Sequence, residues 1–167
     1  MRQAIERIYW ERRQGLYTLA LAITRCPGRA EDAIQEAFAR LWKTAARPGG
    51  DLVPYVFAAV RNTALDQLRR QEAAAGAEPA SIYNGLPADP ASEIITAEEH
   101  RLVREAVESL PEDQREAVVM RIYGNLTFEE MAKALGEPLQ TVASRYRRAI
   151  EKLGEKVKRV AGPSHDQ

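Results

Sequence analysis

The stretch TFEEMAKALGEPLQTVASRYRRAIEKL, residues 127–153, decides the fold of the second half of the chain. Thr127 followed by Glu130 has the spacing of a capping box, in which a hydroxyl and a carboxylate satisfy free amides at a helix start. Gly136 and Pro138 end this short helix, and a longer one follows. Its apolar residues recur every three or four positions, which is typical of one helix face: Val142, Tyr146, Ile150, Leu153, Val157 and Val160.

A basic stripe runs beside that apolar face and keeps the same steps: Arg145, Arg148, Lys152, Lys156 and Arg159. A short helix, a turn containing glycine and a second helix of this kind form the pattern of a helix-turn-helix, whose second helix enters the major groove of DNA. The small side chain of Ala132 favours a close crossing of the two helices. An ordinary amphipathic hairpin with a solvated basic face is the alternative interpretation.

Helical patterns fill the rest of the chain, and no stretch shows the alternation of a strand. Apolar residues from Ile5 to Ile23 predict a first helix, which Pro27 and Gly28 interrupt. A second helix follows, with Glu31 and Asp32 in its first turn, where the helix dipole favours acids. A third begins after Pro54, and the pattern resumes beyond residue 93 with four more. We therefore predict an all-α protein.

The composition divides the chain into two small helical domains. Residues 73–92 are rich in Ala, Gly, Pro, Glu and Ser, with few large apolar side chains, and this indicates a flexible acidic linker. The predicted domains are residues 1–72 and 93–160, followed by a tail over 161–167. The second domain contains the helix-turn-helix.

The formal net charge of zero, from 24 basic and 24 acidic residues, conceals a segregation of charge. Residues 1–72 hold twelve basic and eight acidic side chains, and residues 139–160 hold seven basic and two acidic. Acidic stretches lie between these two segments. The asymmetry points to a polyanion contacted at two places, although solvated helix faces give a similar pattern.

Several classes of protein are excluded by residue content. The single cysteine, Cys26, rules out an internal disulfide. A zinc site is also excluded, because Cys26, His100 and His165 are too few and too scattered to bind the ion, so no metal and no cofactor is expected. The longest apolar run, Leu16 to Ile23, is too short to span a bilayer, and the first residues do not form a signal peptide. No catalytic constellation is present. We expect a cytoplasmic protein that is not an enzyme.

Two sets of motifs, in order, resemble a known family. Three stretches are similar to region 4 of bacterial sigma factors: Leu110 to Glu116, Thr127 to Ala132 and Thr141 to Leu153. Ala30 to Trp42 is similar to region 2.2, and Arg61 to Arg70 is similar to regions 2.3 and 2.4. With a short linker and no domain between the two sets, the chain resembles the extracytoplasmic-function (ECF) group of the sigma-70 family.

The resemblance implies a factor that binds core RNA polymerase and directs promoter recognition and transcription initiation. The partners it implies are the beta-prime clamp helices and the beta flap of polymerase, and promoter DNA; an anti-sigma factor that clamps the two halves together is a further partner that it allows. The resemblance places the clamp contact on the second helix, at Asp32, Gln35, Phe38, Leu41 and Trp42. Phe38 and Leu41 also fit a core position, and Trp42 fits either role.

The resemblance also assigns the DNA contacts. The minus 10 element would meet Lys43, Arg61, Asn62, Arg69 and Arg70, with a flipped base held in the loop from Lys43 to Pro54. Asp66, acidic within this basic segment, is interpreted as a structural partner of a neighbouring arginine. The minus 35 element would meet Arg115, as a phosphate contact, and Thr127, Thr141, Ser144, Arg145, Arg147 and Arg148. Ala143 stands where many members carry Lys or Arg, which shifts the base readout along the helix.

Two other classes of protein remain as alternatives. A free-standing helix-turn-helix transcription regulator would bind DNA by itself, on a palindrome, with the first domain as a sensor or dimerisation module. An all-helical adaptor without DNA contact would leave the basic stripe from Arg145 to Arg159 unexplained.

Overall fold

The computed structural model describes residues 1–44, 49–74 and 97–161, and every regular element in these ranges is helical. The predicted all-α fold class is therefore confirmed. The elements are α1 (Arg2–Thr24), α2 (Pro27–Lys43), α3 (Leu52–Ala74), α4 (Ala97–Glu108), α5 (Glu112–Val118), the π-helix η2 (Val119–Tyr123), α6 (Phe128–Leu135) and α7 (Leu139–Ala161). Within the described ranges, none of these helices has the length and apolarity to cross a membrane.

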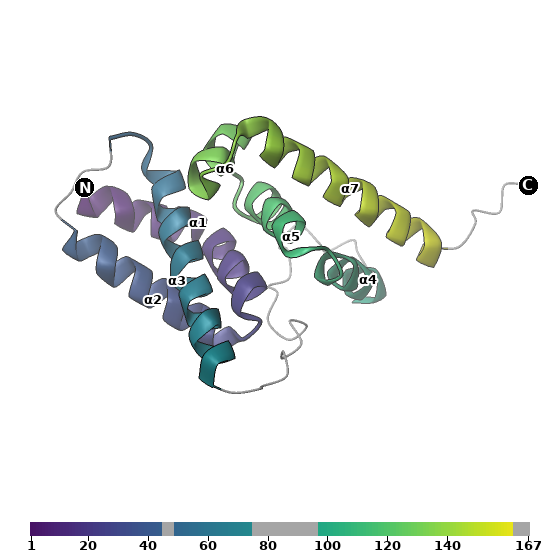
Figure 1. Ribbon diagram of the computed structural model, residues 1–167, viewed down its shortest axis with the longest axis horizontal. Helices are drawn as coiled ribbons and strands as arrows, with labels where there is room; N and C mark the ends of the chain where they lie inside the picture. Colours follow the sequence, from purple (N-terminus) through teal and green to yellow (C-terminus); the bar gives the residue numbers. More distant parts are fainter. Residues whose placement is uncertain (45–48, 75–96, 162–167) are drawn as a thin grey trace, which may run out of the picture.

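Helices α1, α2 and α3 pack as a three-helix bundle around a core that includes Leu16, Phe38 and Val56 (Figure 1). Helix α1 ends with Arg25 in the left-handed region, at φ 55°, and α2 begins immediately afterwards with Pro27 as its first residue. Proline suits this position because its missing amide has no helical partner there. The expected start of this helix was too late, and Glu31 lies beyond its first turn.

The third helix also begins earlier than predicted. Its first residue is Leu52, so Pro54 lies inside the first turn, where a proline is tolerated, and does not precede the helix. At its other end α3 extends to Ala74, and the first two residues of the predicted linker are helical. The remainder of that linker, up to residue 92, lies outside the described residues.

The second half contains the predicted helix-turn-helix. The Thr127 hydroxyl accepts from the Glu130 amide at 3.1 Å, and the Glu130 carboxylate accepts from the Thr127 amide at 2.7 Å, which confirms the capping box. Gly136 ends α6 with φ 65°, a conformation that suits glycine. Helix α7 then packs against α4, α5 and α6.

The two halves lie side by side and share one core (Figure 1). Helix α1 contacts α5 and η2, and α3 contacts α6. The apolar cluster that fills the first bundle continues into the second half through buried residues of α5, η2 and the helix-turn-helix: Ala117, Val119, Met120, Leu126, Met131, Ala134 and Val142.

Candidate nucleic-acid interface

Helix α7 presents the predicted minus 35 face to solvent. Val142 and Ala149 are fully buried against the rest of the second half, and this fixes which side of the helix faces outward. Arg147 and Arg148 are exposed, while Thr141 and Ser144, one turn earlier, are partly exposed. The first three turns of α7 thus carry two exposed guanidinium groups beside two hydroxyls, a combination suited to base edges and phosphates.

Among the predicted minus 35 residues, Arg145 and Thr127 make contacts with other residues of the chain. The Arg145 Nε lies 3.4 Å from the Asp113 carboxylate of α5, and its Nη2 donates to Glu137 at 3.3 Å. These pairs join α5, the turn and α7. The hydroxyl of Thr127 belongs to the capping box. Arg145 therefore orients the helix, and its charge is balanced by two acids.

Arg115 is buried, with only 5% of its surface exposed. Its Nη2 donates to the carbonyls of Glu108 and Leu110, at 2.8 and 2.9 Å, and so fastens the end of α4 to α5. Burial, and then the nearby positive charge of Arg25, lower the pKa of this guanidinium from its ordinary value. In this arrangement Arg115 faces the protein, not solvent, so the phosphate contact stays a prediction.

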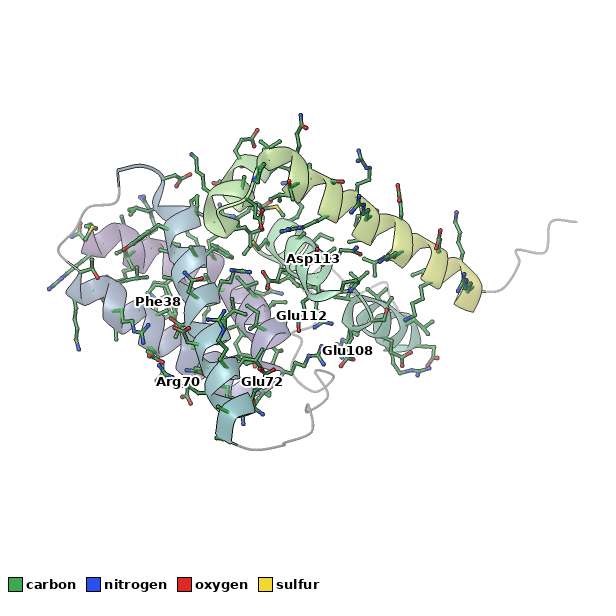
Figure 2. The ribbon with its side chains drawn as sticks, in the orientation of Figure 1. Phe38, Arg70, Glu72, Glu108, Glu112 and Asp113 are labelled. Carbon is green, nitrogen blue, oxygen red and sulfur yellow. The ribbon has the colours of Figure 1, made fainter. Side chains whose placement is uncertain are left out.

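The predicted minus 10 residues lie on α3 and at the end of α2. Lys43, Asn62, Arg69 and Arg70 are exposed. Asp66 lies 3.8 Å from the Arg69 guanidinium, as expected for a neighbouring structural partner. Arg70, labelled in Figure 2, reaches to 4.0 Å from Glu36 of α2.

Arg61, another of the predicted minus 10 residues, is already paired with an acidic side chain of the same chain. Its Nε donates to the Glu116 carboxylate of α5 at 2.6 Å, a contact between the two halves of the chain. The loop expected to hold a flipped base, from Lys43 to Pro54, is only partly placed, because residues 45–48 lie outside the described ranges.

The residues of α2 that were predicted for the clamp contact fall into an exposed group and a buried group. Asp32 and Gln35 are exposed, and Trp42 keeps 47% of its surface in solvent. Phe38, labelled in Figure 2, and Leu41 are buried in the bundle core. Both therefore occupy the core position that the sequence left open for them, and their contact with the clamp stays a prediction. The Phe38 ring packs edge-on against Tyr9 at a centroid distance of 5.1 Å and supports the exposed face from beneath.

A hollow beside this face includes residues that the sequence did not single out. It has a volume of about 720 Å³ and lies between α1 and α2, next to Gln35. Tyr9, Trp10 and Arg13 of α1 line it, with the Arg13 guanidinium 5.9 Å from each ring centroid. Trp10 is 65% exposed, which is unusual for tryptophan. The sequence shows Tyr9 and Trp10 as two adjacent aromatic residues, but this pattern does not indicate which helix lies opposite them.

No three acidic, histidine or cysteine side chains gather as a metal site within the described part of the chain. The arrangement as a whole offers charged and aromatic surfaces on helices. Such surfaces bind and position macromolecules.

Comparison with known families agrees with this arrangement. Residues 8–74 match the family model for Sigma-70 region 2, and residues 100–153 match that for Sigma-70, region 4. The matches follow the same order as the two motif sets and together span most of the chain. The protein therefore belongs to the sigma-70 family.

Relatives and a solved structure indicate to which group of sigma factors the chain belongs. The chain is 27% identical to the ECF RNA polymerase sigma factor SigK of Mycobacterium tuberculosis, over 90% of this chain and 83% of that protein. It is 29% identical to SigK of Mycolicibacterium vanbaalenii, over 90% and 80%. The fold is similar to the sigma factor RpoE of Bartonella quintana, solved with the anti-sigma factor NepR, with a TM-score of 0.72, 22% identity and coverage of 93% and 97%. This chain is an RNA polymerase sigma factor of the ECF type.

Proposed function

We propose that this sigma factor binds core RNA polymerase through the exposed side of α2, meets the minus 10 element through α3 and meets the minus 35 element through α7. The observation that carries the proposal is the pair of exposed guanidinium groups, Arg147 and Arg148, in the first three turns of the second helix of a helix-turn-helix. In this class of fold, that position faces the major groove.

We further propose that the chain binds and positions without chemistry of its own, and that it acts in the cytoplasm, where polymerase supplies the catalysis. Its beta-prime partner would dock on Asp32, Gln35 and Trp42. An exposed aromatic flanked by hydrogen-bonding groups is the usual energetic centre of an interface. The beta flap remains the partner expected for the second half.

Co-elution with purified core polymerase tests this proposal against its rivals. The sigma factor is expected to form a complex with core and to bind a promoter tightly only within it. A free-standing regulator would instead bind a palindromic duplex alone and ignore core polymerase. An all-helical adaptor would bind neither the promoter nor the palindromic duplex, even at raised protein concentration.

The clamp contact can be tested by a double substitution, Asp32→Ala with Gln35→Ala. Both side chains are exposed on α2, so helical content should persist, while affinity for core polymerase should fall by about tenfold or more because interface groups lose their partners. Gln3→Ala with Glu6→Ala, an acid and an amide exposed on α1, is the matched control. Core affinity equal to that of the control would remove α2 from the interface.

We also propose an anti-sigma partner that holds the two halves together. The relative from Bartonella quintana was solved with such a factor, and the halves of this chain already lie against each other. Affinity purification of the chain from its native host should yield a second partner besides polymerase. Recovery of polymerase alone would contradict this proposal.

A further inference from the structure

The hollow between α1 and α2 has an aromatic corner in its lining. The rings of Tyr9 and Trp10 lie with their centroids 5.2 Å apart and their planes at 78°, so the two rings stand nearly perpendicular to each other. The buried ring of Phe38 packs edge-on against Tyr9 and holds it in place. Tyr17, about two turns further along α1, supplies a third aromatic side chain to the lining. The corner is therefore formed before any partner binds.

The chain's own Arg13 shows that this corner attracts a cation. Its guanidinium carbon lies 5.9 Å from the ring centroids of both Tyr9 and Trp10, a distance at which an aromatic face attracts a positive charge. Arg13 itself is exposed to solvent. Contacts of this kind are weak at exposed sites, because water competes for the charge. Another cation can therefore take the place of Arg13.

The charge of the lining also favours a cation. Glu11 and Glu31 line the hollow, against the single positive charge of Arg13. Glu11 lies 4.0 Å from Arg7, whereas Glu31 has no ion-pair partner within the described part of the chain. Burial, and then the negative charge of Glu31, raise the pKa of the Tyr17 hydroxyl from its ordinary value. The same negative charge would repel a phosphate group, so the lining does not suit nucleic acid.

A guanidinium group fits this set of side chains better than an ammonium group does. It is planar, it stacks on aromatic rings, it is more weakly hydrated, and its paired N–H donors match a carboxylate. The hollow, at about 720 Å³, has room for a whole side chain. Trp10 keeps 65% of its surface in solvent, and an exposed tryptophan beside a pocket is typical of an interface that a partner protein covers.

We propose that this hollow is a pocket for an arginine side chain of a partner protein, whose guanidinium group displaces Arg13 from the corner of Tyr9 and Trp10 and pairs with Glu31. The partner is the protein that docks on the exposed face of α2, because Gln35 belongs both to that face and to the lining of the hollow. The choice of core RNA polymerase as this partner rests on the proposed function. The pocket itself is a property of the chain alone.

The pocket is tested on the free chain with arginine amide and with citrulline amide, a neutral molecule of nearly the same shape. The chain has two tryptophans, Trp10 and Trp42, and only Trp10 lines the hollow. Their indole N–H groups give two signals in a nitrogen-15 NMR spectrum. Arginine amide should move the Trp10 signal to saturation and move the Trp42 signal little. Citrulline amide should move neither.

Two substitutions that keep Trp10 should change the affinity for arginine amide in opposite directions. Arg13→Gln removes the competing cation and should raise this affinity about threefold. Arg2→Gln, at an exposed arginine of the same helix outside the lining, is the charge control. Glu31→Gln removes the acidic partner and should lower the affinity about threefold. Glu129→Gln, at an exposed acid of α6, is its control, and neither control should change the affinity.

The partner is tested with purified core polymerase and the full chain. Trp10→Ala should lower the affinity for core about tenfold, because the corner loses one of its two rings. Alanine favours the helix, so α1 is expected to keep its fold. Ile122→Ala, which truncates another exposed apolar side chain, is the matched control and should leave this affinity unchanged.

The contrary outcomes separate the pocket from its partner. Equal movement of the Trp10 signal with both amides, or none with either, would overturn the pocket. Movement with a single-stranded DNA but not with arginine amide would assign the hollow to nucleic acid instead. Equal core affinities of Trp10→Ala and Ile122→Ala would overturn the partner. Failure of the wild-type chain to bind core would overturn the proposed function and the partner together, whereas the NMR result would still decide the pocket.

Discussion

Replacing Phe57 with alanine is expected to lower the free energy of unfolding by about 3 to 5 kcal/mol, the range for truncating a buried phenylalanine. Phe57 is fully buried in α3 and its ring reaches the turn at Gly124, so the cavity opens in the core that both halves share. The loss of stability is therefore expected to affect both halves of the chain.

Urea denaturation followed by two probes distinguishes a shared core from a local one. Both tryptophans, Trp10 and Trp42, lie in the first half, so fluorescence reports that half, whereas circular dichroism reports all helices. The two curves should shift together. Ile122→Ala, a truncation at a side chain that is 55% exposed, is the control and should change stability by less than about 0.5 kcal/mol. A shift in fluorescence alone would show that the halves unfold independently.

Replacing Arg148 with alanine is expected to cost about 1 to 3 kcal/mol of discrimination between matched and mismatched minus 35 sequences, if the contact is bidentate to a base. Arg148 is exposed on the third turn of α7, on the side proposed to face base edges. Arg159 is exposed in the last turn of the same helix, far along it from the proposed base contacts. Arg159→Ala should weaken all sequences equally, with a shallower dependence on salt.

Transcription by the assembled holoenzyme, on matched and mismatched promoters at two salt concentrations, measures both effects. If Arg148→Ala lowers transcription equally on every promoter, this side chain contacts only the phosphate backbone of the DNA. Arg145→Ala adds a useful comparison, because Asp113 and Glu137 pair with this guanidinium and its removal should disturb the orientation of α7.

Local patterns in the sequence predicted the local structure well. The capping box at Thr127 and Glu130 and the pairing of Asp66 with Arg69 involve residues three positions apart, and the helix geometry that joins them is set within one turn. The helical class and the helix-turn-helix followed from periodicity for the same reason. Among the described residues, the starts of the second and third helices were misplaced, at proline residues, and the third helix ends two residues later than predicted.

Contacts between distant residues could not be predicted in this way. Arg61 and Glu116 are 55 positions apart, and nothing in either neighbourhood indicates the other. Phe38 lies on a periodic apolar face, but periodicity does not say whether another helix or a partner covers it. Arg115 was assigned to a phosphate by the resemblance to region 4, and no local pattern indicated that carbonyl groups of its own chain would surround it.

Promoter-dependent run-off transcription with purified core polymerase tests the central claim most directly. Core polymerase is mixed with a promoter template from the native host, with and without this chain, and transcript start sites are mapped. The account predicts a single start site that requires the chain and is lost with Asp32→Ala and Gln35→Ala together. Identical transcripts with and without the chain would contradict it.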